Sequence, residues 1–539
     1  MKKRAVAAIL LAAVALNACT PAEEGRGSVS NTEEKNTEVP VVDLGGNAEV
    51  TPTEAETPEP TQEVTEPTVY TGEMRTLQIE AEEVFDGWSN DNYDYSAHIE
   101  APEIKLEEES FPDLAKALGD YGRSLQDTAK NTDLPEMIDI CKEMETSVPE
   151  PEENVYLVSE YSTGVVRADT VITSLLTTRY ADYHGAHPST VYMTKNFDSV
   201  SGQELDIYDV INEDQMDGLP ELIADTLLEE YAEVDFYEPE NLTGTVDDLL
   251  GMNSDLTFTL DYSGITFYFS AYDLAPYAYG PQFVTFRYED YPELVKTEYQ
   301  QAPDNYIYPL NSYGSNILPD GRGLELHIFA FGEEYAEGYT IDTALEGNKA
   351  SYEIYDAFDV TPWLVHFNDN DYMYVEWSTF NDYGMISVFD LNGSKVGAPQ
   401  EFPGSLPGSP TNPENMKIRR RGDMLSTVGT FCYYSVGNDG MPVALTDYEF
   451  INSEVELTLK QDLTCECRSD FDAPEDAAEE TLAKGTRIRF YAQNEKEGWV
   501  DCVLPDGRYV RIYVDCSDYP RTVDGKDIEL LFDGLFWAG

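Results

Sequence analysis

Two kinds of apolar pattern alternate along residues 73–300. Residues 92–106 and the stretch 155–183, which is rich in Val, Thr, Ile and Tyr, predict extended strands. Residues 111–130 and 214–231 instead repeat leucine and other apolar residues at intervals of three and four, which predicts two amphipathic helices.

Short strands follow the second helix at residues 256–260, 265–269 and 283–288. The sequence Asp261-Tyr-Ser-Gly264 between the first two predicts a hairpin turn. Because helices and strands do not alternate regularly, the pattern favours an α+β sheet domain over a parallel doubly wound one.

Residues 301–450 predict a β-rich domain with many turns. Residues 371–377 and 385–389 look like paired strands, followed by an Asn392-Gly393 turn. The pair is similar to a propeller blade, but no clean period repeats, so a sandwich is equally open. No function is predicted for this segment.

The last segment, 451–539, has short strands separated by turns. Lys484-Gly485, Gly498-Trp499 and Asp506-Gly507 stand in the order typical of the bacterial SH3-like module, which this segment resembles. Arg508 departs from the Gly that the family often has there. The complete expectation is therefore a multidomain protein with an α+β sheet domain, a β-rich domain and a small SH3-like β-barrel.

The N-terminus predicts export and lipidation. A cationic start, Met1-Lys-Lys-Arg4, precedes an uncharged apolar run over residues 5–16. That run is shorter than the about 20 apolar residues of a membrane-spanning helix and suits a signal peptide. Leu16-Asn-Ala-Cys19 resembles a bacterial lipobox, so residues 1–19 predict a lipoprotein signal with a lipid on Cys19. An ordinary secretory signal is the alternative.

Residues 20–72 predict a disordered acidic tether. The segment consists mostly of Glu, Thr, Pro, Gly, Asn and Ser, and it has no aromatic residue between Thr20 and Val69. Such a chain buries too little apolar surface to offset the entropy of ordering it. We expect it to hold the folded part away from the outer face of the membrane.

The net charge of the protein restricts the classes of partner that it can bind. Acidic residues outnumber Lys and Arg by 104 to 33, which gives a net charge of −71. This balance argues against nucleic acid and anionic lipid surfaces, which need basic patches. It permits a cationic partner, although a strongly acidic solvated exterior explains the charge equally well.

Two ordered motifs lie within residues 73–300. The first is His184-Gly-Ala-His187-Pro188, continuing through Ser201-Gly202, and the second is the strand pair over 258–269 followed by Tyr272-Asp-Leu-Ala-Pro-Tyr277-Ala-Tyr279-Gly280. Together they resemble the extracellular domain shared by RsiV-type anti-sigma factors and PdaC-type peptidoglycan deacetylases. His184 replaces the first Gly of that family's pattern, and Ser201 replaces a Thr.

The resemblance implies a binding role. The RsiV domain is a lysozyme receptor, whereas in the deacetylases it accompanies the enzyme. The sequence has neither the anti-sigma segment with its membrane-spanning helix nor the Thr-Phe-Asp-Asp-Gly stretch that the deacetylases use for metal. We therefore expect a lysozyme-like cationic protein or peptidoglycan as partner.

The candidate contact residues lie at the predicted strand ends, where aromatic and polar side chains combine. They are Tyr183, His184, His187, Tyr277 and Tyr279. A His-x-x-His pair also suits zinc, but a catalytic zinc site needs a third protein ligand. A tight bend with a purely structural His187 is a further alternative. The sequence predicts no metal site, no cofactor and no catalytic residue.

Four cysteines fall in the last segment: Cys465, Cys467, Cys502 and Cys516. Cys465 and Cys467 lie two apart, so on a strand both face the same way. An extracellular location favours two disulfides that join them to Cys502 and Cys516, in either connectivity. Free buried thiols are the alternative.

Two functions follow from these observations. The first is a surface-anchored lipoprotein that binds or senses an extracellular protein or a cell-wall component. The second is a cell-wall-active enzyme, or an accessory subunit of an enzyme that modifies peptidoglycan. The sequence shows no recognisable catalytic motif, which favours binding.

Overall fold

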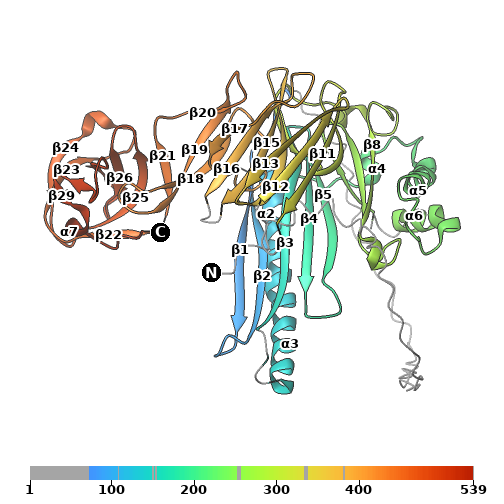
Figure 1. Ribbon diagram of the computed structural model, residues 1–539, viewed down its shortest axis with the longest axis horizontal. Helices are drawn as coiled ribbons and strands as arrows, with labels where there is room; N and C mark the ends of the chain where they lie inside the picture. The colour runs from blue at the N-terminus through green and yellow to red at the C-terminus, as the bar shows by residue number, and fades with distance from the viewer. Residues whose placement is uncertain are drawn as a thin grey trace, which may run out of the picture.

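The structure is a computed structural model that describes residues 72–106, 108–148, 151, 154–251, 256–332, 338–379, 383–453 and 455–537 (Figure 1). The predicted signal sequence with Cys19, and nearly all of the predicted tether, lie outside these residues. The described chain is multidomain and strand-rich with few helices. Within it, no helix has the length and apolar character needed to cross a membrane.

The first sheet has five strands arranged in chain order. They are β1 (Ile79–Ser89), β2 (Tyr95–Leu106), β3 (Val155–Ala168), β4 (Ile172–Asp182) and β5 (Ser189–Asp198). Only the pair β2 and β3 is parallel. A parallel pair needs a crossover, and the chain makes it through α2 (Pro112–Thr128), η2 (Ala129–Asp133) and α3 (Leu134–Ser147).

Apolar periodicity explains how the crossover packs. Leu114, Leu118 and Leu125 form the buried stripe of α2, and the strands contribute Ile99 and Ile104 to the same cores. The helix covers the sheet because its apolar stripe has no other place to avoid water. Figure 1 shows α2 and α3 running along the long strands.

A second unit follows the first sheet. Three antiparallel strands, β6 (Thr257–Leu260), β7 (Gly264–Phe269) and β8 (Gln282–Arg287), share one core with helices α4 (Ile207–Val210), α5 (Leu219–Glu230) and α6 (Leu242–Gly251). Short helical turns flank them: η3 (Met216–Gly218), η4 (Pro239–Asn241), η5 (Tyr277–Tyr279) and η6 (Thr297–Tyr299). The Asn196 side chain on β5 donates to the Phe258 carbonyl at 2.9 Å and so ties β6 to the first sheet.

The third unit is a sandwich of two antiparallel sheets. One sheet contains β10 (Tyr313–Ile317), β11 (Gly323–Phe331), β12 (Gly338–Leu345) and β13 (Asn348–Tyr355). The other contains β9 (Tyr306–Pro309), β14 (Ala357–Phe367), β15 (Asn370–Thr379), β16 (Gly384–Asp390) and β17 (Gln400–Pro403). Leu326 and Ile341 of the first sheet share a core with Leu364 and Met373 of the second. The sandwich alternative therefore describes this segment, and the predicted pair of strands is β15 with β16.

An eleven-stranded sheet forms the C-terminal end. Its strands are β18 (Met416–Gly422), β19 (Val428–Val436), β20 (Pro442–Ala444), β21 (Glu449–Asn452), β22 (Glu456–Leu459), β23 (Leu463–Arg468), β24 (Ala478–Leu482), β25 (Arg487–Asn494), β26 (Trp499–Val503), β27 (Tyr509–Tyr513) and β30 (Phe532–Asp533). The small elements η7 (Pro474–Asp476), β28 (Thr522–Val523), β29 (Lys526–Asp527) and α7 (Ile528–Leu531) complete it.

This last sheet does not stop at the expected boundary near residue 450. Strand β21 pairs with β19 on one side and β25 on the other, so hydrogen bonding runs through residue 450. Met416 and Ile418 of β18 and Cys432 and Tyr434 of β19 pack with Trp363 of the sandwich, so a further core joins the sandwich to the C-terminal sheet. Among the described strands no closed barrel is detected, and the SH3-like barrel stays a prediction.

Candidate functional site

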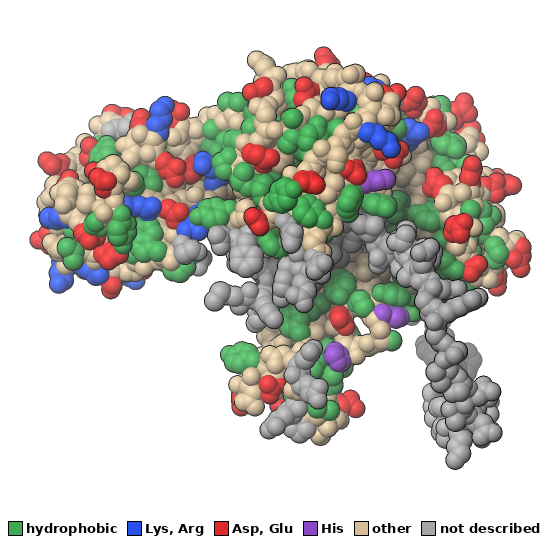
Figure 2. All heavy atoms as spheres, viewed as in Figure 1, with side chains coloured by type: hydrophobic (Ala, Val, Ile, Leu, Met, Phe, Trp, Pro, Cys, Tyr) green, Lys and Arg blue, Asp and Glu red, His purple; other side chains and the backbone are tan. Residues whose placement is uncertain are grey.

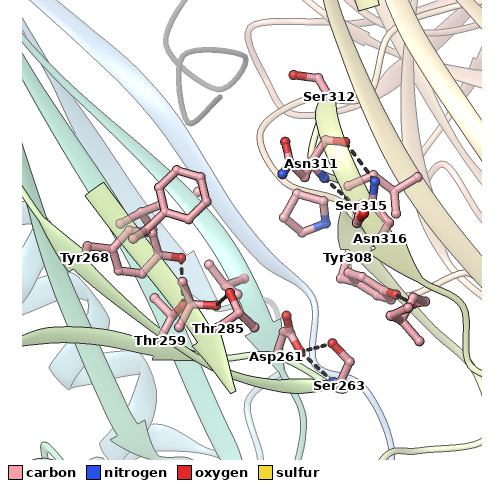
Figure 3. Close-up of a pocket in the computed structure, with 18 of the residues that line it drawn as sticks. Thr259, Asp261, Ser263, Tyr268, Thr285, Tyr308, Asn311, Ser312, Ser315 and Asn316 are labelled. Carbon is pink, nitrogen blue, oxygen red and sulfur yellow. Dashed lines mark hydrogen bonds between the residues drawn. The ribbon is translucent and has the colours of Figure 1, made fainter. Parts of the chain in front are cut away.

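A cavity of about 520 Å³ lies where the first three units meet (Figure 3). Strands β3 and β4 provide one wall, with Ser162 opposite Thr178 and Gly164 opposite Leu176. Strands β6 to β8 provide the second wall, and the segment from Tyr308 to Ile317 provides the third. Three separate stretches of sequence therefore border one open cavity.

Hydroxyl and amide groups stand beside apolar residues in the second and third walls. The Tyr268 and Thr259 hydroxyls lie 3.0 Å apart, and those of Thr266 and Thr285 lie 2.8 Å apart. Across the cavity in Figure 3, the Asn316 side chain donates to the carbonyl of Asn311 at 2.9 Å. A hydrogen bond holds each of these pairs in place. The lone pairs and protons that the bond does not use therefore point in fixed directions.

The charged group Asp261 occupies the hairpin turn predicted from the sequence. Its carboxylate accepts from the Ser263 hydroxyl at 2.7 Å and from the Gly264 amide at 2.8 Å, which closes the turn. Burial is the main cause of the raised pKa of Asp261. The same cause raises the pKa of Glu230, at the end of α5. These acids therefore stay partly protonated at higher pH than exposed carboxyls do.

One buried arginine holds the walls together. Arg167 on β3 donates to the carbonyl of Asp261 at 3.2 Å, to that of Tyr299 at 2.6 Å and to that of Gln301 at 2.8 Å. Its guanidinium also lies over the Tyr262 ring. The guanidinium fork thus links the first sheet to the β6–β7 turn and to the chain that enters the third unit.

Two of the predicted contact residues come together outside the cavity. The rings of His187, in the β4–β5 loop, and Tyr277, in η5, stack with centroids 3.7 Å apart and planes at 15°. The His187 Nε2 atom also hydrogen-bonds the hydroxyl of Tyr272 at 2.8 Å, and Tyr272 was not among the predicted contact residues. We call His187, Tyr272 and Tyr277 the aromatic cluster.

The other three predicted contact residues have hydrogen-bond partners of their own. Tyr183 accepts a hydrogen bond from Arg179 at 3.1 Å and packs against the core beneath α3. The exposed His184 has a left-handed backbone with φ of 58°, held by its amide on Asp182. Tyr279 donates to Asp235 at 2.7 Å. A single contact surface that includes all five residues stays a prediction.

The part of the chain that the structure describes offers no set of side chains that could act as zinc ligands. Within those residues, no group of three His, Cys, Asp or Glu side chains is arranged to hold a metal ion. His187 instead uses both ring nitrogens locally, with Nδ1 3.0 Å from the Pro188 carbonyl.

A comparison with protein families matches residues 208–289 to the model described as a protein of unknown function, DUF3298. Residues 208–289 are a DUF3298 domain. A DUF3298 family structure from Bacteroides fragilis is 16% identical to this chain in sequence. The match covers 41% of this chain and 94% of that chain, with a TM-score of 0.32. A second DUF3298 family structure, from Pseudomonas aeruginosa, is 15% identical in sequence. The match covers 42% of this chain and 98% of that chain, with a TM-score of 0.28. The comparison with curated proteins finds no match.

The DUF3298 domain contributes to both candidate sites. It contains strands β6 to β8, which form the second wall of the cavity. It also carries Tyr272 and Tyr277 of the aromatic cluster, whose third member comes from the first sheet. The first sheet and the third unit, which lie outside the family match, complete the cavity.

The four cysteines of the predicted disulfides carry free thiols in this structure. Cys465, Cys467, Cys502 and Cys516 are free thiols, as are Cys141 and Cys432. Cys467 and Cys502 both pair with Val510 from opposite sides, so two strand spacings, about 9–10 Å, separate them. A disulfide needs Cα atoms within about 7 Å. Cys516 lies elsewhere, with its Sγ 3.9 Å from the Met424 carbonyl.

Proposed function

We propose that the protein is a binding lipoprotein of the outer face of a bacterial membrane, and that its cavity holds a polyhydroxylated ligand such as a cell-wall glycan fragment. One observation carries this proposal: three units border a cavity whose walls present paired hydroxyls and amides. A ligand that offers many hydroxyl groups matches such a lining, because its hydroxyls can both donate to and accept from these side chains.

Size and composition support a small-molecule site. Cavities that hold small ligands measure about 300–1,000 Å³, and they combine apolar surface with a few fixed polar groups. Here Leu176, Phe283 and Tyr308 supply apolar surface beside the hydroxyls. The resemblance of residues 73–300 to domains found near peptidoglycan makes wall glycan the first ligand to test.

The test is direct binding to soluble chitooligosaccharides and peptidoglycan fragments, measured by calorimetry. Thr285→Val removes a lining hydroxyl that bonds Thr266. Thr481→Val is the matched control, because Thr481 makes the same cross-strand bond to Thr464 far from the cavity. Losing one neutral hydrogen bond to ligand should weaken binding about 2- to 10-fold for Thr285→Val, with Thr481→Val unchanged.

Two results would contradict the proposal. Absence of binding to every glycan would remove the ligand class, and equal losses in both variants would remove the cavity as its site. Mass analysis of the incubated glycans covers the enzyme alternative. Shortened or deacetylated products would show that the protein is an enzyme and not a binding protein.

A cationic extracellular protein, such as a lysozyme, is the second candidate partner. The net charge of −71 favours it, and Figure 2 shows acidic side chains spread over the visible face and frequent at the α5–α6 end. Tyr272 of the aromatic cluster is 52% exposed and available for short-range contact. The two partners use different surfaces and are tested separately.

The anchor is part of the same proposal. Cys19 lies outside the described residues, and its lipidation rests on the lipobox resemblance. Cys19→Ala should abolish labelling of the protein by a fatty-acid probe in cells. Undiminished labelling would reject lipidation and leave the ordinary secretory signal.

A further inference from the structure

The wall of the cavity on β3 and β4 continues into a carboxylate. Gly164 with Leu176, and Ser162 with Thr178, are consecutive cross-strand rows that line the cavity. The next row on the same face is Glu160 with Tyr180. Two residues of a strand span about 6.6 Å, so Glu160 lies directly beside the cavity wall.

Glu160 belongs to a cluster of three carboxyl groups. Its neighbour on the parallel strand β2 is Glu100, and Glu83 on β1 reaches the carboxyl of Glu100 with its side chain. Only 4% of Glu100 and 5% of Glu160 is exposed. The Oε1 atom of Glu100 and the Oε2 atom of Glu160 have no hydrogen-bond partner within the described chain. We call these three residues the carboxyl cluster.

The charged neighbours that act on the carboxyls of Glu100 and Glu160 are themselves acidic. The groups that act on Glu100 are Glu83 and Glu160, and the one that acts on Glu160 is Glu83. Burial, followed by these neighbours, raises the pKa of Glu100 to about 9. Unpaired buried carboxyls are costly unless a partner compensates them, so the cluster is suited to a positively charged group from outside.

Aromatic rings neighbour the cluster, because Phe85 on β1 is the cross-strand partner of Glu100. Phe85 lies 5.7 Å from His98, and His98 lies 6.2 Å from Tyr156, measured between ring centroids. Phe85 is 58% exposed and Tyr156 is 40% exposed, so this rim is open to solvent. Carboxylates beneath aromatic faces form the environment that recognises organic cations. Within the described residues the acids are not arranged as a metal site.

We propose that Glu83, Glu100 and Glu160 form a subsite for an ammonium group carried by the cavity's ligand, which makes that ligand a polyhydroxylated amine. This inference rests on the proposed glycan binding and specifies it further. The ammonium comes either from an amino sugar whose amine is free or from the peptide of a cell-wall fragment. Both sources present the same cation to the carboxyl cluster.

The experiment compares glucosamine oligomers with N-acetylglucosamine oligomers of equal length on the intact protein. It is done by calorimetry at about pH 6, where amines are protonated. The wild type should prefer the free amine at least tenfold. Glu160→Gln should reduce that preference to within twofold and leave the binding of the acetylated oligomer unchanged. Glu109→Gln, a change at an exposed glutamate away from the cluster, should keep the wild-type preference.

Each outcome decides between the two proposals. Equal affinity of the wild type for both oligomers overturns the ammonium subsite and leaves glycan binding intact. Absence of binding to either oligomer and to peptidoglycan fragments overturns both. A lysine-containing wall peptide that competes for the site in the wild type, but not in Glu160→Gln, assigns the ammonium to the peptide and supports the subsite. Near-ultraviolet circular dichroism checks that the Glu160→Gln variant is folded.

Discussion

Arg167 and Asp169 form an ion pair in which neither side chain is exposed, with Nε and Oδ2 2.6 Å apart. The second oxygen of Asp169 accepts from the amides of Val171 and Ile172, which shapes the turn between β3 and β4. All the charge of the pair is therefore hydrogen-bonded without water. The pair fixes the strand that forms one cavity wall, and Arg167 joins this strand to the β6–β7 turn and to the chain that enters the third unit.

Replacing Arg167 should cost more stability than replacing any exposed arginine. Arg167→Met leaves Asp169 buried without its partner and orphans three carbonyl groups, so we expect a loss of about 3–5 kcal/mol in the free energy of unfolding. Arg508, an exposed arginine paired with Glu480 and Asp506, is the control, and Arg508→Met should change little. Urea unfolding of both variants measures this, and similar losses would contradict it.

Glu100 should make the protein less stable as the pH rises. Its folded-state pKa of about 9 is above its ordinary value of 4.5, so the folded state holds a proton that the unfolded chain releases. The stability that this proton contributes is complete below about pH 4.5 and is lost progressively towards pH 9. Glu100→Gln removes this dependence, so its melting temperature should fall less between pH 5 and pH 8.5 than that of wild type.

The high net charge also lowers stability as pH rises, so this test needs a control. Glu109→Gln removes one exposed carboxylate and should retain the full wild-type decrease. If Glu100→Gln shows the same decrease as Glu109→Gln, the Glu100 carboxyl is ionised in the folded protein at neutral pH.

The sequence predicted those helices and strands whose apolar pattern lies within their own residues. The expected helix over 111–130 is α2, and the expected strand over 92–106 is β2, because each carries its periodicity in its own residues. Helix α3 was missed, although Pro135 in its first turn and the spacing of Met137 and Cys141 indicate it. The pairing of β21 through residue 450 depends on partners about 20 and 40 residues away, which no local pattern specifies.

The site was less predictable because its residues are chemically ordinary. Histidines and tyrosines near Gly and Pro drew attention to His187 and Tyr277, and those two do meet. The cavity is lined by Ser, Thr and Asn residues from widely separated segments, and such residues occur throughout the sequence. The neighbouring carboxyls of Glu100 and Glu160 depend on one parallel register, which only the folded chain establishes.

The cysteines should all react as free thiols once the chain is unfolded. In the folded protein, Cys516 is exposed and should be alkylated first, whereas Cys502 is fully buried and should react last. Burial also raises the pKa of the Cys502 thiol, which keeps it in the unreactive protonated form. Mass spectrometry of the exported protein without reductant counts the modified sites. Four blocked thiols in the last segment would instead restore the two disulfides.

Binding of a cationic protein to the aromatic cluster should separate into two measurable parts. The acidic surface should speed encounter, so the on-rate for lysozyme should fall with added salt, because about 0.1 M salt screens exposed charges beyond about 10 Å. The short-range contacts should set the off-rate, so Tyr277→Ala should raise it about tenfold.

Tyr313→Ala is the matched control: Tyr313 stacks on His327 at 4.6 Å, on a different unit. Surface plasmon resonance at two salt concentrations measures both rates. Binding that vanishes at physiological salt and ignores Tyr277 would be nonspecific charge attraction, and the aromatic cluster would then be a structural support of the β4–β5 loop.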